Sequence, residues 1–424
     1  MPMKIIVFMN RANGSIHYLS NCLHRTHSLK VWSWALLLMI SLIFPRMSYS
    51  DDFEYKMKAG LKEEYTDNLF FDQENEMEGW STVLMTQAIL KNSSDRLKTR
   101  LSGEWSRTFY EDYHDLNNDD WVVKSGIDWI SHENTTCTMN LSIGEDSNID
   151  SYLSSTGLLL NTEKHEFKKG EVSINQRFSE RFSSELSLNY TDESTASNDD
   201  GYGDYSLTSK DVSAGMAFQI NELTIFNFNS GYGFYDYDTN TVEQVYASLG
   251  MSRSVDERLS FFCNMGSRYT TYAYDVLVGI DMGTHPPSYI YDETSYSNWG
   301  FIGKTGFVYK NEDSTIKITV DESLQPSTGQ SQSMDRTSVD VSYNKRLSDD
   351  FTYRISSFYR LNRSDEKDAA GDERLKTFGL SPSFSYQLMD DLLLAGYHTF
   401  TKYRSSSGYQ LQRNVYRFQL EYTF

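Results

Sequence analysis

Long apolar stretches are nearly missing from this chain of 424 residues. Its mean hydropathy of −0.55 is too polar for a protein that crosses a bilayer with several apolar helices. One apolar run stands out, the 14 residues from 31 to 44, whereas a membrane-spanning helix needs about 20. The composition therefore excludes a helical membrane protein.

The apolar run has the surroundings of a secretory signal peptide. Basic residues precede it, and small residues at Ser48 and Ser50 follow it. This is the order of the charged, apolar and cleavage regions in such a peptide. We therefore expect residues 1–50 to form a cleaved signal peptide and residues 51–424 to form the mature protein.

Positive charge is also scarce. The chain has 39 Lys and Arg against 59 Asp and Glu, a formal net charge of −20. Removal of residues 1–50 takes away five basic residues and no acids, so −20 becomes −25. Because nucleic-acid binding needs an excess of Lys and Arg to neutralise phosphates, no nucleic-acid partner is expected.

Cysteine and histidine are too few to indicate a catalytic or metal site. Only Cys137 and Cys263 lie in the mature part, at predicted lipid-facing positions of distant strands, so we expect free thiols. The five mature histidines form no recognisable nucleophilic motif, and there is no P-loop, dinucleotide fingerprint or zinc spacing. We predict no catalytic residue, cofactor or metal ligand, and we keep an outer-membrane enzyme only as an alternative.

The last sixteen residues, by contrast, carry a strong pattern. Polar and apolar side chains alternate from Tyr409 to the carboxyl end, which suits a barrel wall between lipid and water. An edge strand of a soluble sandwich is the alternative. Bacterial outer-membrane barrel proteins commonly end on Phe, and this resemblance implies recognition by the barrel-assembly machinery. The outward side chains of this assembly signal are Phe418, Tyr422 and Phe424.

Short acidic turns recur from residue 51 onward, each between two alternating runs, as in tight hairpins. Longer polar stretches separate them, which matches the short periplasmic turns and long extracellular loops of a transmembrane barrel. Eight turns joining nine hairpins predict an all-β, antiparallel up-and-down barrel of about 18 strands, with both ends in the periplasm. The turns lie at residues 92–95, 132–134, 179–181, 221–222, 256–257, 311–314, 348–350 and 389–391.

The predicted inner face is basic and the predicted outer loops are acidic. Six long loops, at 67–78, 110–120, 147–162, 192–206, 235–241 and 275–293, contain 22 Asp and Glu and no Lys or Arg. One interpretation is that lumen charges merely pair while the loops bind cations shared with lipopolysaccharide. The other is that a cationic lumen passes an anionic or polar polymer, which the acidic mouth then repels. The pore-lining candidates are Lys58, Lys62, Arg100, Arg268, Arg354, Arg360, Arg413 and Arg417.

Eighteen strands enclose more space than their own side chains fill, so an aqueous channel is expected unless loops close it. Two loops are candidates for a constriction. Residues 275–293 form the longest loop and contain Pro286 and Pro287, whereas residues 158–160 form a Leu-Leu-Leu segment that is poorly placed in water.

A motif at the predicted mature N-terminus carries a family resemblance. Residues 58–70 read KAGLKEEYTDNLF, and the Tyr-x-Asp-Asn-hydrophobic element resembles the outer-membrane β-barrel porins associated with bacterial exopolysaccharide loci. The resemblance implies a barrel that assists polysaccharide export, with polysaccharide export components as partners. Asp67 and Asn68 could also simply end a strand and open a loop.

The patterns together indicate a channel in the bacterial outer membrane, in contact with lipid and lipopolysaccharide, that passes a polar or anionic polymer such as exopolysaccharide. A surface adhesin or receptor built on a plugged barrel is the main alternative.

Overall fold

The structure is a computed structural model that describes residues 52–71, 73, 76–147, 164–195, 205–237, 240–281, 288–327, 332–364 and 374–424. The predicted signal peptide and the Leu-Leu-Leu segment lie outside these residues. One compact unit comprises Glu54–Lys91 and Asp95–Phe424, and it forms the barrel described below. No described helix is long and apolar enough to cross a membrane.

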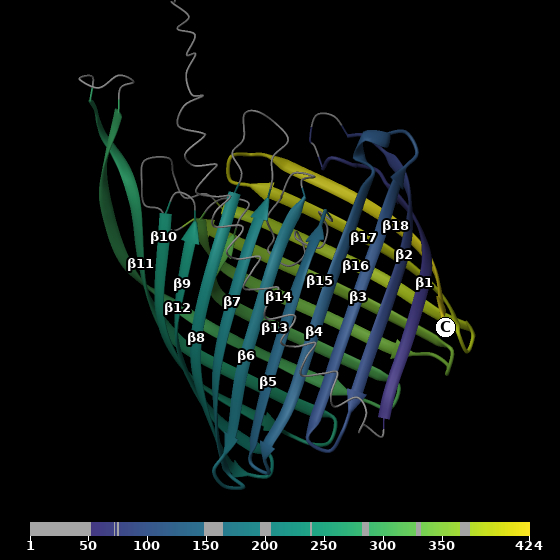
Figure 1. Ribbon diagram of the computed structural model, residues 1–424, viewed down its shortest axis with the longest axis horizontal. Coiled ribbons are helices and arrows are strands. Elements are labelled where there is room, and N and C mark those ends of the chain that lie inside the picture. The colour runs from purple at the N-terminus through teal and green to yellow at the C-terminus, as the bar shows by residue number, and fades with distance from the viewer. Residues whose placement is uncertain are drawn as a thin grey trace, which may run out of the picture. The chain divides into compact units, whose positions relative to one another are not determined.

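Eighteen antiparallel strands follow one another around the barrel, each beside its neighbours in the chain (Figure 1). The first nine are β1 Asp52–Thr66, β2 Gly79–Ser93, β3 Leu97–Tyr110, β4 Asn118–His132, β5 Thr135–Asp146, β6 His165–Arg177, β7 Phe182–Thr195, β8 Tyr205–Asn221 and β9 Thr224–Tyr237. The others are β10 Asn240–Ser254, β11 Leu259–Asp281, β12 Ser288–Lys310, β13 Ser314–Ser327, β14 Gln332–Arg346, β15 Phe351–Ser364, β16 Arg374–Met389, β17 Leu392–Ser405 and β18 Gln410–Thr423. A single 3-10 turn, η1 (His114–Leu116), lies between β3 and β4. The predicted fold class and strand number are confirmed.

The first and last strands close the barrel. β1 pairs with β18 over nine residues, from Lys58 opposite Thr423 to Thr66 opposite Val415. The N–H of Phe424 donates to the carbonyl oxygen of Met57 at 2.8 Å, so the carboxyl-terminal residue extends this seam. Closure leaves no strand edge at the ends of the sheet, as a barrel in lipid requires.

All eight predicted turns join consecutive strands, from the β2–β3 turn to the β16–β17 turn. Their chemistry is local. In the β10–β11 turn, the Asp256 carboxylate accepts the N–H groups of Arg258 and Leu259, both at 2.7 Å. These bonds lower the pKa of Asp256, because they favour the charged carboxylate.

Two of the predicted long loops are largely strand. β9 ends at Tyr237 and β10 begins at Asn240, so the 235–241 connection is short. β11 and β12 stay paired up to Asp281 opposite Ser288, and they extend past the other strands rather than turning inward (Figure 1). Residues 275–281 and 288–293, predicted to belong to a long loop, are therefore strand, because the β11–β12 ladder continues through them.

The outer surface of the barrel is apolar. Phe418, Tyr422 and Phe424 are 60, 42 and 70% exposed, and Trp299 of β12 is 74% exposed. An apolar belt rich in Trp and Tyr on a closed barrel matches the lipid-facing band of an outer-membrane protein. The protein is accordingly located in the bacterial outer membrane.

Candidate channel interior

All eight predicted pore-lining cations lie on the inner face of the barrel, but their environments differ. Strand pairing places them on the face opposite the apolar outer surface. Arg100 and Arg354 are exposed to the interior, whereas Arg268, Arg360 and Arg413 are 1, 7 and 6% exposed. A cation that faces the interior can therefore be either exposed to solvent or buried.

Acidic and basic side chains form a network of ion pairs along the β1–β18 seam. Glu64 accepts from Arg417 at 2.6 Å and lies 3.2 Å from the Lys62 ammonium. Lys58 donates to Glu421 at 2.7 Å. The side chains of Lys62, Glu64 and Arg417 are only 15–17% exposed. The expected basic wall in open water is therefore an ion-paired seam, because strand closure brings acids opposite the cations.

The first outer loop is bonded directly to β18. The backbone and side-chain N–H groups of Asn414 both donate to the Asp67 carboxylate at 2.7 Å. The Asn68 side chain donates to the carbonyl oxygen of Gln412 at 3.2 Å, and Arg413 donates to Thr66 Oγ1 at 3.0 Å. The Asp-Asn pair of the sequence motif thus joins the start of this loop to the terminal strand.

Beyond this attachment, the loop turns its apolar side chains inward. Leu69 and Phe71 are 4 and 1% exposed. Phe71 has a φ of 50°, a left-handed backbone conformation that is uncommon for a bulky residue. Its ring belongs to a buried cluster on the inner face. The other members are Met334 of β14, Leu375 of β16, Tyr403 of β17 and Leu411 of β18.

The wall is discontinuous between β12 and β13. Their ladder has eight residue pairs and ends at Gly303 opposite Glu322. β13 and β14 remain paired with each other up to Ser327 opposite Gln332. We call the two segments 323–327 and 332–336 the inner hairpin. Its side toward β12 therefore has no described ladder partner.

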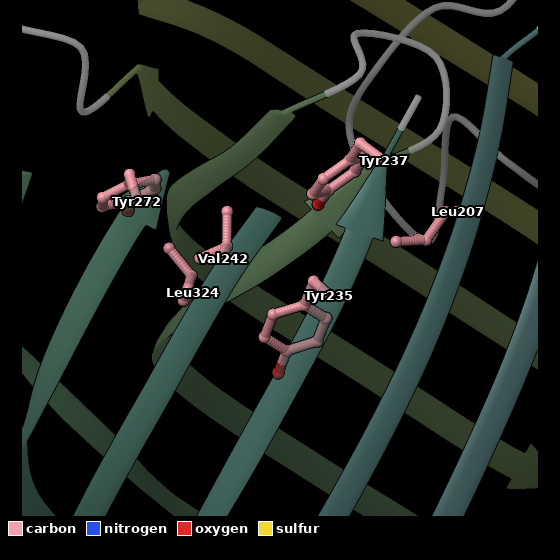
Figure 2. Close-up of a cluster of buried hydrophobic side chains, with 6 residues drawn as sticks. All are labelled: Leu207, Tyr235, Tyr237, Val242, Tyr272 and Leu324. Carbon is pink, nitrogen blue, oxygen red and sulfur yellow. The ribbon is translucent and has the colours of Figure 1, made fainter. Parts of the chain in front are cut away.

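One face of the inner hairpin packs against inward side chains of β8–β11. Leu324 shares a buried cluster with them, and Figure 2 shows it beside Val242. The Ser333 hydroxyl lies 2.9 Å from the Tyr237 hydroxyl in a buried hydrogen bond. The remaining cluster members are Leu207, Tyr235, Tyr237 and Tyr272.

The two faces of the inner hairpin contact different walls. Leu324 and Asp335 are opposite each other in the β13–β14 ladder, and alternation gives Met334 the other face. Met334 packs in the cluster with Phe71 and the inward residues of β16–β18. The Leu324 face of the hairpin therefore packs on the inner face of β8–β11, while residues 334–336 remain paired with β15. Apolar packing in the described interior thus involves β13 and β14, and the Leu-Leu-Leu segment predicted as a constriction lies outside the described residues.

Arg268 of β11 connects the wall to the inner hairpin. Its guanidinium donates to the carbonyl oxygen of Phe301 at 2.9 Å and forms an ion pair with Asp335. Gly300 lies beneath it, where an added Cβ would come within 2.5 Å of the Arg268 Cζ. A buried arginine is costly without a counter-ion, so Asp335 stabilises it where it is.

The interior on the periplasmic side of the inner hairpin is polar. One row across β14–β16 consists of Ser342, Ser356 and Ser381, which are opposite one another in the ladders. Six of the exposed inward cations lie within the strands, and none of these six forms an ion pair with a side chain that the structure describes. They are Lys98, Arg100, Lys124, Lys304, Lys317 and Arg354. This part of the lumen can accommodate water and negative charge.

Among the residues that the structure describes, no group of three His, Cys, Asp or Glu could hold a metal ion. Cys137 and Cys263 are free thiols, and both lie on the outer face by strand pairing.

The sequence offers no direct signal for the inner hairpin. Leu324 continues the apolar alternation of Ile316, Ile318 and Val320 closely enough to look lipid-facing. Its contact with the inner face of β8–β11 depends on where the β12–β13 ladder ends, and that is a property of two strands together.

Among known proteins, only solved structures resemble this chain. No protein-family model matches the sequence, and no curated protein matches it. OccK2 (OpdF) of Pseudomonas aeruginosa is 13% identical, with 88% of this chain and 98% of that chain covered and a TM-score of 0.45. The FrpB iron transporter of Neisseria meningitidis is 9% identical, with 82 and 62% covered and a TM-score of 0.45. The alcaligin outer membrane receptor FauA of Bordetella pertussis is 12% identical, with 86 and 76% covered and a TM-score of 0.43.

Proposed function

We propose that this protein is a non-enzymatic outer-membrane channel that passes polar, anionic solutes. The supporting observation is the set of six exposed and unpaired cations on the inner face. Cations that line a polar lumen lower the energy of an anion inside it, because a charged wall sets the local potential. The serine row across β14–β16 supplies hydroxyl groups that can hydrogen-bond a hydrated cargo.

The cargo that we propose is an acidic or neutral polysaccharide moving outward. Its support is the Tyr65-x-Asp67-Asn68 motif, which resembles exopolysaccharide-associated porins. In the fold, this motif ends β1 and joins the first loop to β18. The proposed partners are the export components that would deliver such a polymer from the periplasm, together with lipopolysaccharide and the barrel-assembly machinery.

A planar-bilayer recording of the assembled full-length protein tests the channel. A reversal potential that favours anions is expected across a salt gradient. Replacing Arg100, Lys124 and Arg354 together by Gln should shift it toward cations, because all three lie exposed on the inner face. Lys402→Gln is the matched control, since Lys402 is exposed on the outer face. Cation selectivity in the parent, or equal shifts in both variants, contradicts the proposal.

The extension of β11 and β12 favours the receptor alternative. Each has 23 residues, compared with 12–17 in the other strands. A surface hairpin of this length can contact a partner outside the membrane. Absence of conductance in the parent protein would favour this second function.

A further inference from the structure

We propose that the outer face of β16 and β17 binds lipopolysaccharide, the phosphorylated glycolipid of the outer leaflet. The site is a cluster of three side chains, Arg374, Lys376 and Arg404, which we call the basic patch. This inference names the place where the proposed lipopolysaccharide partner is held. It depends on the location of the barrel in the outer membrane and not on conduction through the lumen, so the two proposals can fail separately.

The basic patch lies on the lipid-facing side of the barrel. In the β16–β17 ladder Lys376 is opposite Arg404, and Arg374 lies two residues before Lys376 at the start of β16. Their neighbours Leu375 and Tyr403 point inward, into a buried cluster of the interior. Because successive side chains of a strand point to opposite faces, the three cations point outward, and all three are exposed. They lie at the extracellular end of the two strands, away from the 389–391 turn.

An apolar surface lies beside the basic patch, toward the periplasm. Phe378 is two residues from Lys376 and Phe400 is four residues from Arg404, on the same face, and the two ring centroids are 6.4 Å apart. Phe378 is 40% exposed, and Leu380 is 37% exposed. Since a strand advances about 3.3 Å per residue, the cations stand roughly 7–13 Å beyond the rings. A phosphorylated lipid can therefore place its acyl chains against the rings and its phosphates against the cations.

The strands that carry the basic patch supply no negative charge. β15, β16 and β17 contain no Asp or Glu, and neither Lys376 nor Arg404 forms an ion pair with a side chain that the structure describes. Arg363 of β15 is opposite Arg374 and adds a further cation, whereas Lys402 lies nearer the rings, opposite Phe378. Like charges directly opposite each other in a ladder are destabilising. A phosphate group would supply the counter-charge that the strands lack.

Outward cations on another part of the wall are paired, by contrast. Arg107 of β3 lies 3.7 Å from Asp119 of β4, and Lys168 of β6 lies 3.2 Å from Asp192 of β7. In both cases the acid is directly opposite the cation in the ladder. These two cations therefore provide a matched control for the basic patch, because they share its outward face but already have their counter-charge.

The side chains of the basic patch suit a phosphorylated sugar head group. A guanidinium donates two parallel N–H groups to phosphate oxygens, and an ammonium is a compact donor. Residues opposite each other in a ladder have Cβ atoms about 5 Å apart, so Lys376 and Arg404 can reach the same phosphate. Gln410 of β18 is opposite Arg404 and exposed, and its amide can hydrogen-bond a sugar hydroxyl. Basic clusters at the membrane surface bind anionic lipid head groups in this way.

The test titrates the assembled full-length protein in detergent micelles with bis-phosphorylated lipid A and follows binding by native mass spectrometry. Replacing Lys376 and Arg404 together by Gln should raise the apparent Kd by about tenfold or more, because two charge-assisted contacts are lost. Arg107→Gln with Lys168→Gln is the matched control and should keep the Kd of the parent. Lys376→Arg with Arg404→Lys keeps both charges and should retain most of the affinity. Heat-modifiable migration in gels verifies that each variant barrel is folded.

Dephosphorylated lipid A separates recognition of phosphate from contact with acyl chains. It should bind the parent and the Lys376→Gln/Arg404→Gln variant equally. Equal affinity of these two proteins for bis-phosphorylated lipid A, or an equal loss in the control variant, would overturn the proposal. Displacement of the lipid by inorganic phosphate at the same concentration would assign the patch to a free anion and overturn the lipid assignment. An anion-selective parent that binds no lipid A would refute this inference and leave the channel standing.

Discussion

The charge network at the β1–β18 seam makes a quantitative prediction for Glu64→Gln. Glu64 is the shared acceptor for Arg417 at 2.6 Å and Lys62 at 3.2 Å. The substitution keeps the size of the side chain and removes its charge. Two cations that are 17% exposed would then remain in the seam without the negative charge of Glu64.

The expected cost follows from the burial of these cations. Removing one partner of a fully buried ion pair costs about 3–5 kcal/mol. Because the three side chains keep 15–17% of their surface, water screens part of the remaining charge. We therefore expect a loss of about 2–3 kcal/mol, or roughly a 30- to 150-fold change in the unfolding equilibrium at about 1.4 kcal/mol per factor of ten.

The measurement is reversible urea unfolding of the barrel in detergent micelles or vesicles. Glu63→Gln is the matched control, because Glu63 is adjacent in sequence but faces outward, where both carboxylate oxygens accept from Thr82 at 3.0 Å. Glutamine keeps one acceptor there, so the free energy of unfolding of this variant should be close to that of the parent. A Glu64→Gln barrel as stable as the parent, or two variants destabilised equally, would refute the role of the seam network.

Three further outcomes are expected. Phe418→Arg should reduce insertion at a cost of about 2–4 kcal/mol near the midplane, whereas Ser356→Arg in the serine row of the inner face should insert normally; equal membrane yields would contradict the lipid-facing assignment. Gly300→Ala should destabilise the barrel, because the new Cβ would displace the Arg268 guanidinium from its ion pair with Asp335, and a urea unfolding curve equal to that of the parent would contradict this. Asp256 has a lowered pKa in the folded protein, so its stabilisation is present above about pH 4, the ordinary range of an aspartate, and is lost as the pH falls through the folded value. An Asp256→Ala difference in stability that persists unchanged at lower pH would contradict this.

The strands and turns were predictable because their signals are local. Each acidic turn carries its own hydrogen-bonding chemistry, as Asp256 does with two following N–H groups. Each strand shows a period of two that is read within a few residues, as in the alternation ending at Phe418 and Tyr422. Neither the turns nor the alternation requires knowledge of which strands become neighbours. Only the β1–β18 seam does.

The environments of the cations were not predictable from the same pattern. Alternation assigns Arg354 and Arg417 to one face correctly, yet Arg354 is exposed and Arg417 is ion-paired. The difference depends on Glu64, which is more than 350 residues away in the chain and becomes a neighbour only through the β1–β18 register. Facing the lumen is a local property, whereas contact with water depends on what the opposite strands supply.

The inner hairpin shows why alternation alone cannot identify what an apolar face packs against. A period of two assigns a residue to one face of its strand, and this assignment holds for Leu324 in the β13–β14 ladder. It does not say whether that face meets lipid or another wall of the same barrel, since both environments are apolar. That choice depends on the end of the ladder at Gly303 and Glu322 and on the reach of Arg268 across Gly300 to Asp335. A residue that is lipid-facing by pattern can therefore pack against another wall of the same barrel, as Leu324 does against Val242 and Tyr272.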